Sequence, residues 1–287
     1  MSRIEINGVT KKYGKTTALK NVNLVFEANK IHGLLGRNGA GKTTLLNLIT
    51  NKIFPTEGEI TVCGESAIEN DKVLNTMFYM MEQNIFPKST KVIEAFRWTS
   101  EIYKSFDMDY AKELSARFEL NTSKKIKQLS TGYKSIFKAI ATLASNAEIM
   151  LFDEPVLGLD AYHRDMFYAE LIDNYSKNQK TIIVSTHLIE EVSNILEEVI
   201  IIKKGRIIKQ ESVENLLLSS YTIAGENSKV DEYLKDREYV GVNGIGEFKK
   251  AIVLEKNINK DINLANKLDL KFGKTELQKL FISLTES

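Results

Sequence analysis

The sequence has a single cysteine, Cys63, and only three prolines among 287 residues. One cysteine excludes an internal disulfide framework and is typical of proteins in a reducing compartment. Aliphatic runs such as Val199–Ile202 are far shorter than the roughly 20 apolar residues that a membrane-spanning helix needs. The first residues alternate between charged and apolar types and lack the apolar core of a signal peptide. We therefore expect a soluble protein of the cytosol.

An excess of either charge is also missing, because 39 basic residues stand against 38 acidic ones and the net charge is +1. No overall field therefore favours nucleic acid or an anionic surface, and we expect no nucleic-acid partner. The chain has no internal repeat, no low-complexity stretch and no proline-rich linker. Its length suffices for one large domain with an appendage, or for two medium domains.

The apolar pattern alternates between strand and helix periods. Ile4, Ile6 and Val9 alternate with polar residues and predict a half-buried edge strand, and Val22–Phe26 repeats this period. Ile31–Leu35 predicts a short buried strand, and residues 148–155 and 180–187 predict two more, joined by a crossover helix. Between the first of these strands and the second, residues 84–145 carry apolar residues three and four apart, which predicts a helical insert. This order is typical of an α/β fold.

The segment "GRNGAGKTT" fits the pattern G-x-x-x-x-G-K-[ST] and lies between a predicted strand and a predicted helix. Its glycines let successive backbone N–H groups turn inward onto phosphate oxygens, and the helix N-terminus adds a positive end. Lys42 would reach the β- and γ-phosphates, and the Thr43 hydroxyl would bind Mg²⁺. A chance glycine-rich turn is the alternative. The residues expected to bind ATP here are Asn38, Gly39, Gly41, Lys42, Thr43 and Thr44.

The run "IMLFDEP" delivers two carboxylates to the end of a buried strand, where ligands bind in open α/β sheets. Asp153 would hold Mg²⁺ through its water shell, and Glu154 would orient and polarise the attacking water. His187 ends the next predicted strand and would contact the γ-phosphate or the water. The alternatives are that the two acids cap a turn and that His187 is structural.

Five motifs occur in order: the phosphate loop, "QLSTGYKS", "MLFDEP", "GLD" and "STH". Over about residues 1–210 the chain thereby resembles the nucleotide-binding domain of ABC (ATP-binding cassette) ATPases. The resemblance implies a P-loop NTPase fold with a mostly parallel core sheet, an antiparallel β-subdomain and the helical insert. Residues 1–212 would form this domain and residues 213–287 a small C-terminal accessory segment. The resemblance also implies that the protein is a Mg²⁺-dependent ATPase.

The resemblance assigns further residues. In that family two cassettes dock head to tail, so the signature turn Ser130, Thr131 and Gly132 would cap the γ-phosphate held by a second ABC ATPase subunit. An ordinary helix N-cap by Ser130 is the alternative. Tyr13 resembles the aromatic residue that stacks on adenine, although a plain loop tyrosine is possible. Asp160 resembles the acid of the loop that crosses the dimer interface.

Two positions depart from the family pattern. Thr131 replaces the first glycine of the signature pair, which makes one backbone approach bulkier. The loop that normally offers a glutamine to Mg²⁺ and water reads "YMMEQNIFP", which puts Glu82 on the glutamine position with Gln83 next to it. Either side chain offers an oxygen to Mg²⁺, but Glu82 adds a negative charge.

The resemblance further implies the motor subunit of a transporter, held at the cytoplasmic face of the cell membrane by a separate permease. The permease would dock on the helical insert, where Trp98 is the preferred contact; its aromatics could equally be core. The tail "ELQKLFISLTE" resembles that of ATPases serving bacterial exporters, so we expect export of a peptide, toxin or drug. The alternative is a soluble ABC ATPase of a non-transport assembly or repair machine.

Overall fold

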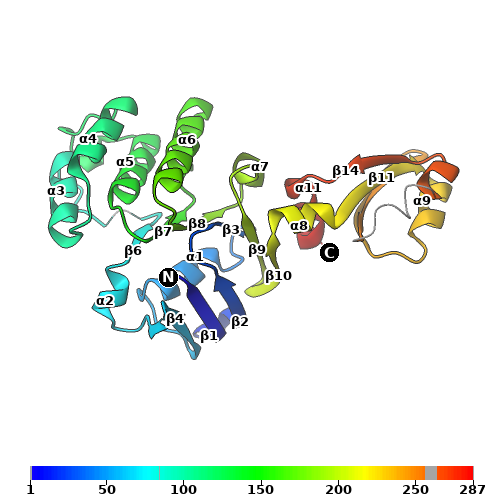
Figure 1. The fold of residues 1–287 in the computed structure, drawn as a ribbon, viewed down its shortest axis with the longest axis horizontal. Coiled ribbons are helices and arrows are strands. Elements are labelled where there is room, and N and C mark those ends of the chain that lie inside the picture. Colours follow the sequence, from blue (N-terminus) through cyan, green and yellow to red (C-terminus); the bar gives the residue numbers. More distant parts are fainter. Residues whose placement is uncertain (1, 84, 256–263, 287) are drawn as a thin grey trace. The chain divides into compact units, whose positions relative to one another are not determined.

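The computed structural model describes residues 2–83, 85–255 and 264–286. The chain divides into two compact units (Figure 1). The first comprises Met1–His187 and Ile202–Lys209, and the second comprises Leu188–Ile201 and Gln210–Ser287. Within the described ranges, no helix combines the length and the apolar character needed to cross a bilayer.

A six-stranded sheet carries the candidate site. Its strands lie in the order β10 (Arg206–Ser212), β9 (Glu198–Lys203), β3 (Ile31–Leu35), β8 (Thr181–Thr186), β7 (Ile149–Asp153) and β6 (Met77–Met80). The neighbouring pairs β3–β8, β8–β7 and β7–β6 are parallel. Every residue of β3, β7 and β8 is buried, which is why these strands are almost continuously apolar in sequence. The predicted parallel core sheet is confirmed.

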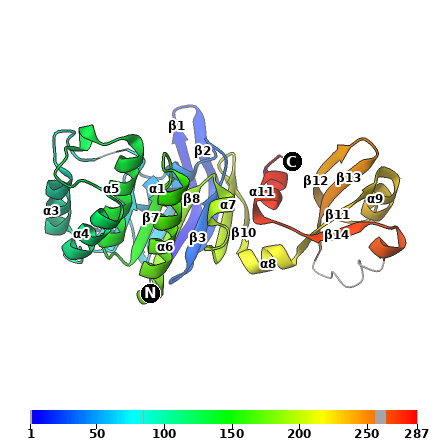
Figure 2. The ribbon, with the colours of Figure 1, turned by 90° about the horizontal axis from the view of Figure 1, so that it is seen from above.

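Parallel register brings the ends of these strands together at one edge. Leu35 pairs with Thr186 across β3 and β8, and Asp153 pairs with Ser185 across β7 and β8. The residues that follow each strand therefore meet at the same edge. Helices α1 (Lys42–Ile49) and α6 (Ala161–Lys177) lie beside these strands, as Figure 2 shows.

An antiparallel sheet follows the order β2 (Thr16–Phe26), β1 (Ile4–Tyr13), β4 (Glu57–Val62) and β5 (Glu65–Ser66). The expectation that Ile4–Val9 forms an edge strand is wrong. Ile4 pairs with Phe26 on one side and with Val62 on the other, so β1 is an interior strand. Alternation shows only that one face of a strand is buried, and it does not show whether the strand has one neighbour or two.

The helical insert contains α3 (Val92–Ile102), α4 (Met108–Arg117), a 3₁₀ turn (Ile126–Gln128) and α5 (Thr131–Ala144), and it follows the short helix α2 (Asp71–Leu74). Helices α3, α4 and α5 gather in one group in both views (Figures 1 and 2). Phe96 is fully buried with its ring 5.4 Å from that of Phe137, and Phe106 is buried as well. These two aromatics are core, whereas Trp98 is 43% exposed and Ile102 68% exposed.

The second unit has an apolar core of its own. Its antiparallel sheet runs in the order β12 (Tyr239–Ile245), β13 (Phe248–Leu254), β11 (Ser220–Glu226) and β14 (Lys271–Lys274). Helices of this unit include α7 (Ile189–Val192), α8 (Val213–Leu218), α9 (Asn227–Leu234) and α11 (Leu277–Glu286). The Tyr221 and Tyr233 hydroxyls lie 3.0 Å apart in the core, and the Tyr221 ring stacks on Phe272.

Candidate functional site

The loop between β3 and α1 has a backbone that requires glycine. Gly41 adopts φ +114°, and a Cβ built there would lie 2.8 Å from the Leu19 side chain. A larger residue would therefore be strained both by its conformation and by its neighbour. Gly41 also caps α1, and its carbonyl accepts the first helical hydrogen bond, from Leu45. The loop thus leads into the positive N-terminal end of α1.

The Lys42 ammonium group lies inside this loop. Its side chain is only 6% exposed, and it donates a hydrogen bond of 2.7 Å to the Gly36 carbonyl. The nearer carboxylate oxygen of Glu154 is 3.4 Å away. A buried cation with one carbonyl and one carboxylate partner is well placed to bind an anion that enters the loop.

Asp153 accepts hydrogen bonds from three hydroxyl groups. The Thr43 hydroxyl donates to it over 2.7 Å, the Ser185 hydroxyl over 2.8 Å and the Tyr79 hydroxyl over 3.2 Å. The pKa of Tyr79 is raised by burial and, secondarily, by the negative charge of Asp153. Sequence reasoning missed Tyr79 and Ser185. The signal for Ser185 was its place in "STH", whose strand pairs with that of Asp153.

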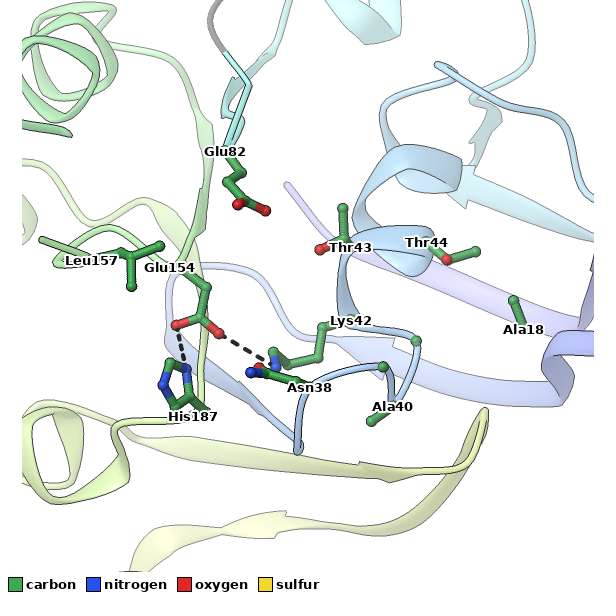
Figure 3. Close-up of a pocket in the computed structure, with 12 residues that line it drawn as sticks. Ala18, Asn38, Ala40, Lys42, Thr43, Thr44, Glu82, Glu154, Leu157 and His187 are labelled. Carbon is green, nitrogen blue, oxygen red and sulfur yellow. Dashed lines mark hydrogen bonds and ion pairs between the residues drawn. The ribbon is translucent and has the colours of Figure 1, made fainter. Parts of the chain in front are cut away.

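Glu154 adopts an unusual backbone conformation, with φ +49°. Non-glycine residues in the left-handed region carry a cost of order 1–3 kcal/mol and occur often at functional sites. Its backbone N–H donates to the Ser185 carbonyl, and its side chain accepts from the Thr186 hydroxyl over 3.2 Å. The His187 Nδ1 lies 2.9 Å from the same carboxylate oxygen (Figure 3). The carboxylate is therefore held between His187 and Lys42.

A cavity of about 390 Å³ lies at this edge of the sheet, and the phosphate loop, Glu154 and His187 line it. Figure 3 shows Lys42, Glu154 and His187 joined by their contacts, with Glu82 opposite Thr43. The predicted residues that line the cavity are Asn38, Gly39, Gly41, Lys42, Thr43, Thr44, Glu82, Glu154 and His187. Asp153 is connected to it through the Thr43 hydroxyl.

Gln83 and Tyr13 are among the predicted residues that do not line this cavity. Gln83 lines a separate, narrow apolar cavity of about 30 Å³ together with Phe78 and Phe86. Tyr13 is 49% exposed at the end of β1, with the Lys11 ammonium group 5.2 Å from its ring centre. The structure thus favours Glu82 over Gln83 at the cavity wall, and the adenine contact of Tyr13 stays a prediction.

The predicted dimer-contact residues cap helices in this chain. The Ser130 side chain accepts a hydrogen bond of 3.2 Å from the backbone N–H of Tyr133 and so caps α5. The Asp160 side chain accepts one of 2.9 Å from the backbone N–H of His163 and caps α6. Neither these two residues nor Thr131 and Gly132 line the cavity. The cap geometry is compatible with both interpretations of Ser130.

The donors at the cavity suit magnesium bound to a nucleotide. Thr43, Asp153 and Glu82 offer hydroxyl and carboxylate oxygens, which Mg²⁺ prefers. No three His, Cys, Asp or Glu side chains form a metal cluster within the described residues. Mg²⁺ is commonly bound by one or two protein groups together with substrate phosphates and water.

Comparison with known proteins agrees with this geometry. The family described as "ABC transporter" matches residues 19–157. The ABC transporter ATP-binding protein YtrB of Bacillus subtilis is 33% identical over 196 residues, which cover 68% of this chain and 67% of YtrB. The nucleoside import ATP-binding protein NupA of Lactococcus lactis is 31% identical, with 71% of this chain and 42% of NupA covered. The bacitracin transport ATP-binding protein BcrA of Enterococcus faecalis is 27% identical, with 74% and 70% covered.

Among solved structures, the fold is similar to a dimeric, post-hydrolysis state of the ATP-binding cassette MJ0796 bound to ADP and phosphate. The TM-score is 0.66 at 26% identity, with 73% of this chain and 98% of that chain covered. The chain belongs to the ATP-binding proteins of the ABC transporter family and is an ABC-type ATPase.

Proposed function

We propose that this chain is the ATP-driven motor of an exporter for a peptide, toxin or drug. In this proposal it docks through its helical insert on a separate membrane permease at the cytoplasmic face of the membrane. Two cassettes, identical or different, close on two ATP molecules and open after hydrolysis. Residues 213–287 form an accessory segment of the motor. The observation that carries the catalytic part is the Lys42–Glu154–His187 arrangement around one cavity.

In the proposed reaction Lys42 binds the β- and γ-phosphates, for which its loop provides inward backbone N–H groups. The γ-phosphate competes with Glu154 for the Lys42 ammonium group, so nucleotide binding frees the Glu154 carboxylate. Glu154 then accepts a proton from the attacking water, while His187 keeps the carboxylate oriented. Thr43, Asp153 and Glu82 would hold Mg²⁺, which neutralises charge on the phosphates when bound.

The second half of each nucleotide site comes from the partner subunit in this proposal. Ser130 and the N-terminal end of α5 supply a hydroxyl, free backbone N–H groups and a positive helix end, which together suit a γ-phosphate. Because only the closed dimer offers this half, ATP favours closure. Shifting an equilibrium from 1:99 to 99:1 takes about 5.5 kcal/mol. Two γ-phosphates that each gain several charge-assisted hydrogen bonds of ~1.5–3 kcal/mol can supply the free energy for this shift.

The direction of transport and the cargo rest on similarity. Helix α11 forms most of the C-terminal segment that resembles the tails of ATPases serving bacterial exporters. The relative BcrA is named for transport of bacitracin. The partly exposed Trp98 and strongly exposed Ile102 on α3 offer apolar surface for a permease.

Transport by purified components tests this proposal. The chain is co-expressed with a candidate permease from a neighbouring gene, and the complex is reconstituted in liposomes with ATP on the motor side. We expect ATP-dependent movement of an amphipathic peptide away from the motor side, and none with Lys42→Ala. Movement toward the motor side would replace export by import. Failure to purify with any multi-span protein would favour a soluble assembly machine.

A further inference from the structure

Lys138 on α5 makes contacts that none of the motifs explains. Its ammonium group donates one hydrogen bond to the Met81 carbonyl, over 2.9 Å, and another to the Glu82 carbonyl, over 2.8 Å. Both acceptors belong to the loop that follows β6. A lysine in the middle of a helix ordinarily extends into solvent, whereas this one is half-buried and fixes the backbone of another segment.

The position of this contact is what gives it a function. Glu82 lines the nucleotide cavity opposite Thr43 (Figure 3), so the Lys138 ammonium group holds the backbone from which the Glu82 carboxylate extends. Two helical turns earlier on α5 stands Ser130, the N-cap of the turn proposed to face the partner's nucleotide. The Lys138 side chain thus connects the Glu82 loop, which lines the nucleotide cavity of the same chain, to helix α5, which is proposed to face the nucleotide of the partner subunit.

The charge of Lys138 also matches the local departure from the family pattern. Where the family offers a neutral glutamine, this chain has the carboxylate of Glu82, and Lys138 experiences the negative charges of both Glu82 and Asp153. Burial lowers the pKa of Lys138, and the nearby carboxylates of Glu82 and Asp153 oppose that lowering. A cation close to both carboxylates reduces their mutual repulsion.

We propose that Lys138 is a positioning residue for the ATPase reaction, which holds the Glu82 loop at the magnesium side of the cavity and offsets the added charge of Glu82. The inference rests on the proposed role of Glu82. The same contact links the Glu82 loop to the helix that Ser130 caps.

Lys138→Met tests the inference because it keeps most of the apolar stem and removes the cation. Lys138→Arg keeps the cation and its donors. Lys180→Met is the matched control, since Lys180 is also a largely buried lysine, donates to the Asn146 side chain and lies outside the nucleotide cavity. Burial lowers its pKa as well.

The first measurement is hydrogen exchange in the nucleotide-free protein. We expect Lys138→Met to speed backbone exchange in residues 78–83 and Lys180→Met to leave that segment unchanged. The second is calorimetric binding of a non-hydrolysable ATP analogue with and without Mg²⁺. Mg²⁺ should increase the affinity for the analogue about tenfold less in Lys138→Met than in the wild type. This factor corresponds to the lower end of the free-energy range for the loss of one charge-assisted hydrogen bond. Lys138→Arg should recover the wild-type effect of Mg²⁺.

A double-mutant cycle tests whether Lys138 acts through Glu82. Lys138→Met should lower the magnesium dependence much less in a Glu82→Gln background than in the wild type, because the carboxylate that Lys138 positions is then absent. Unchanged exchange in residues 78–83, or equal effects of Lys138→Met and Lys180→Met on magnesium dependence, would overturn the inference. If Glu154→Gln and Lys42→Ala still behave as expected below, the proposed function survives that result.

Discussion

Replacing Glu154 by glutamine tests the catalytic assignment most directly. The change is nearly isosteric and leaves an amide oxygen that can still accept from the Thr186 hydroxyl. It removes the negative charge that lies 3.4 Å from Lys42 and 2.9 Å from the His187 ring. The local packing should therefore persist while the proton acceptor is lost.

The expected magnitude follows from the role of a general base. Loss of such a group lowers turnover by about 10²- to 10⁴-fold, which corresponds to about 2.7–5.4 kcal/mol at the transition state. ATP affinity should not fall, because the Glu154 carboxylate competes with the γ-phosphate for Lys42. Two unit charges about 5 Å apart at an effective dielectric constant of 20 repel by up to about 3 kcal/mol, so affinity should stay equal or increase.

Three assays separate these effects. Phosphate release at saturating Mg²⁺ and ATP measures turnover, calorimetry measures nucleotide affinity, and size-exclusion chromatography with ATP detects a trapped dimer. Glu113→Gln is the control, because Glu113 is an exposed acid on α4 outside the nucleotide cavity and should leave all three readings unchanged. Wild-type turnover in Glu154→Gln would refute the assignment, and so would loss of ATP binding with the fold intact.

Four further substitutions test the remaining parts of the site. Lys42→Ala should weaken ATP binding at least tenfold, since it removes the buried cation; an unchanged calorimetric affinity would contradict the role of the phosphate loop. Ser130→Arg should leave ATP binding by the monomer intact but abolish the ATP-induced dimer, and a normal dimer on size-exclusion chromatography would show that Ser130 only caps α5. Gly132→Ala should lower both the melting temperature and dimer formation, whereas Thr131→Gly should change the melting temperature little; equal effects of the two would contradict the packing against Gly158.

The central strands and the phosphate loop could be predicted because their signals are local. An apolar run buried on both faces, a left-handed glycine and a helix start all leave their mark within a few residues. Tyr79 could not be predicted to reach Asp153, because that contact depends on the pairing of the four-residue strand β6 with β7, about seventy residues further along. The contact of Lys138 with the Glu82 loop could not be predicted for the same reason, because only the tertiary structure brings α5 against that loop.

The two positions of the signature turn, 131 and 132, differ in whether the structure tolerates a Cβ atom. Thr131 is exposed at the start of α5, and its side chain is accommodated because the neighbouring residue of the loop before α6 is Gly158, which has no Cβ of its own. At Gly132, a Cβ would lie 2.7 Å from the Gly158 carbonyl oxygen, a contact that only a backbone shift could relieve. Gly158 lies two residues before Asp160 in the loop that caps α6, so Gly132 is fixed by contact within its own chain. Threonine can therefore replace the first glycine of the family's pair, whereas the second must remain glycine even before any partner is considered.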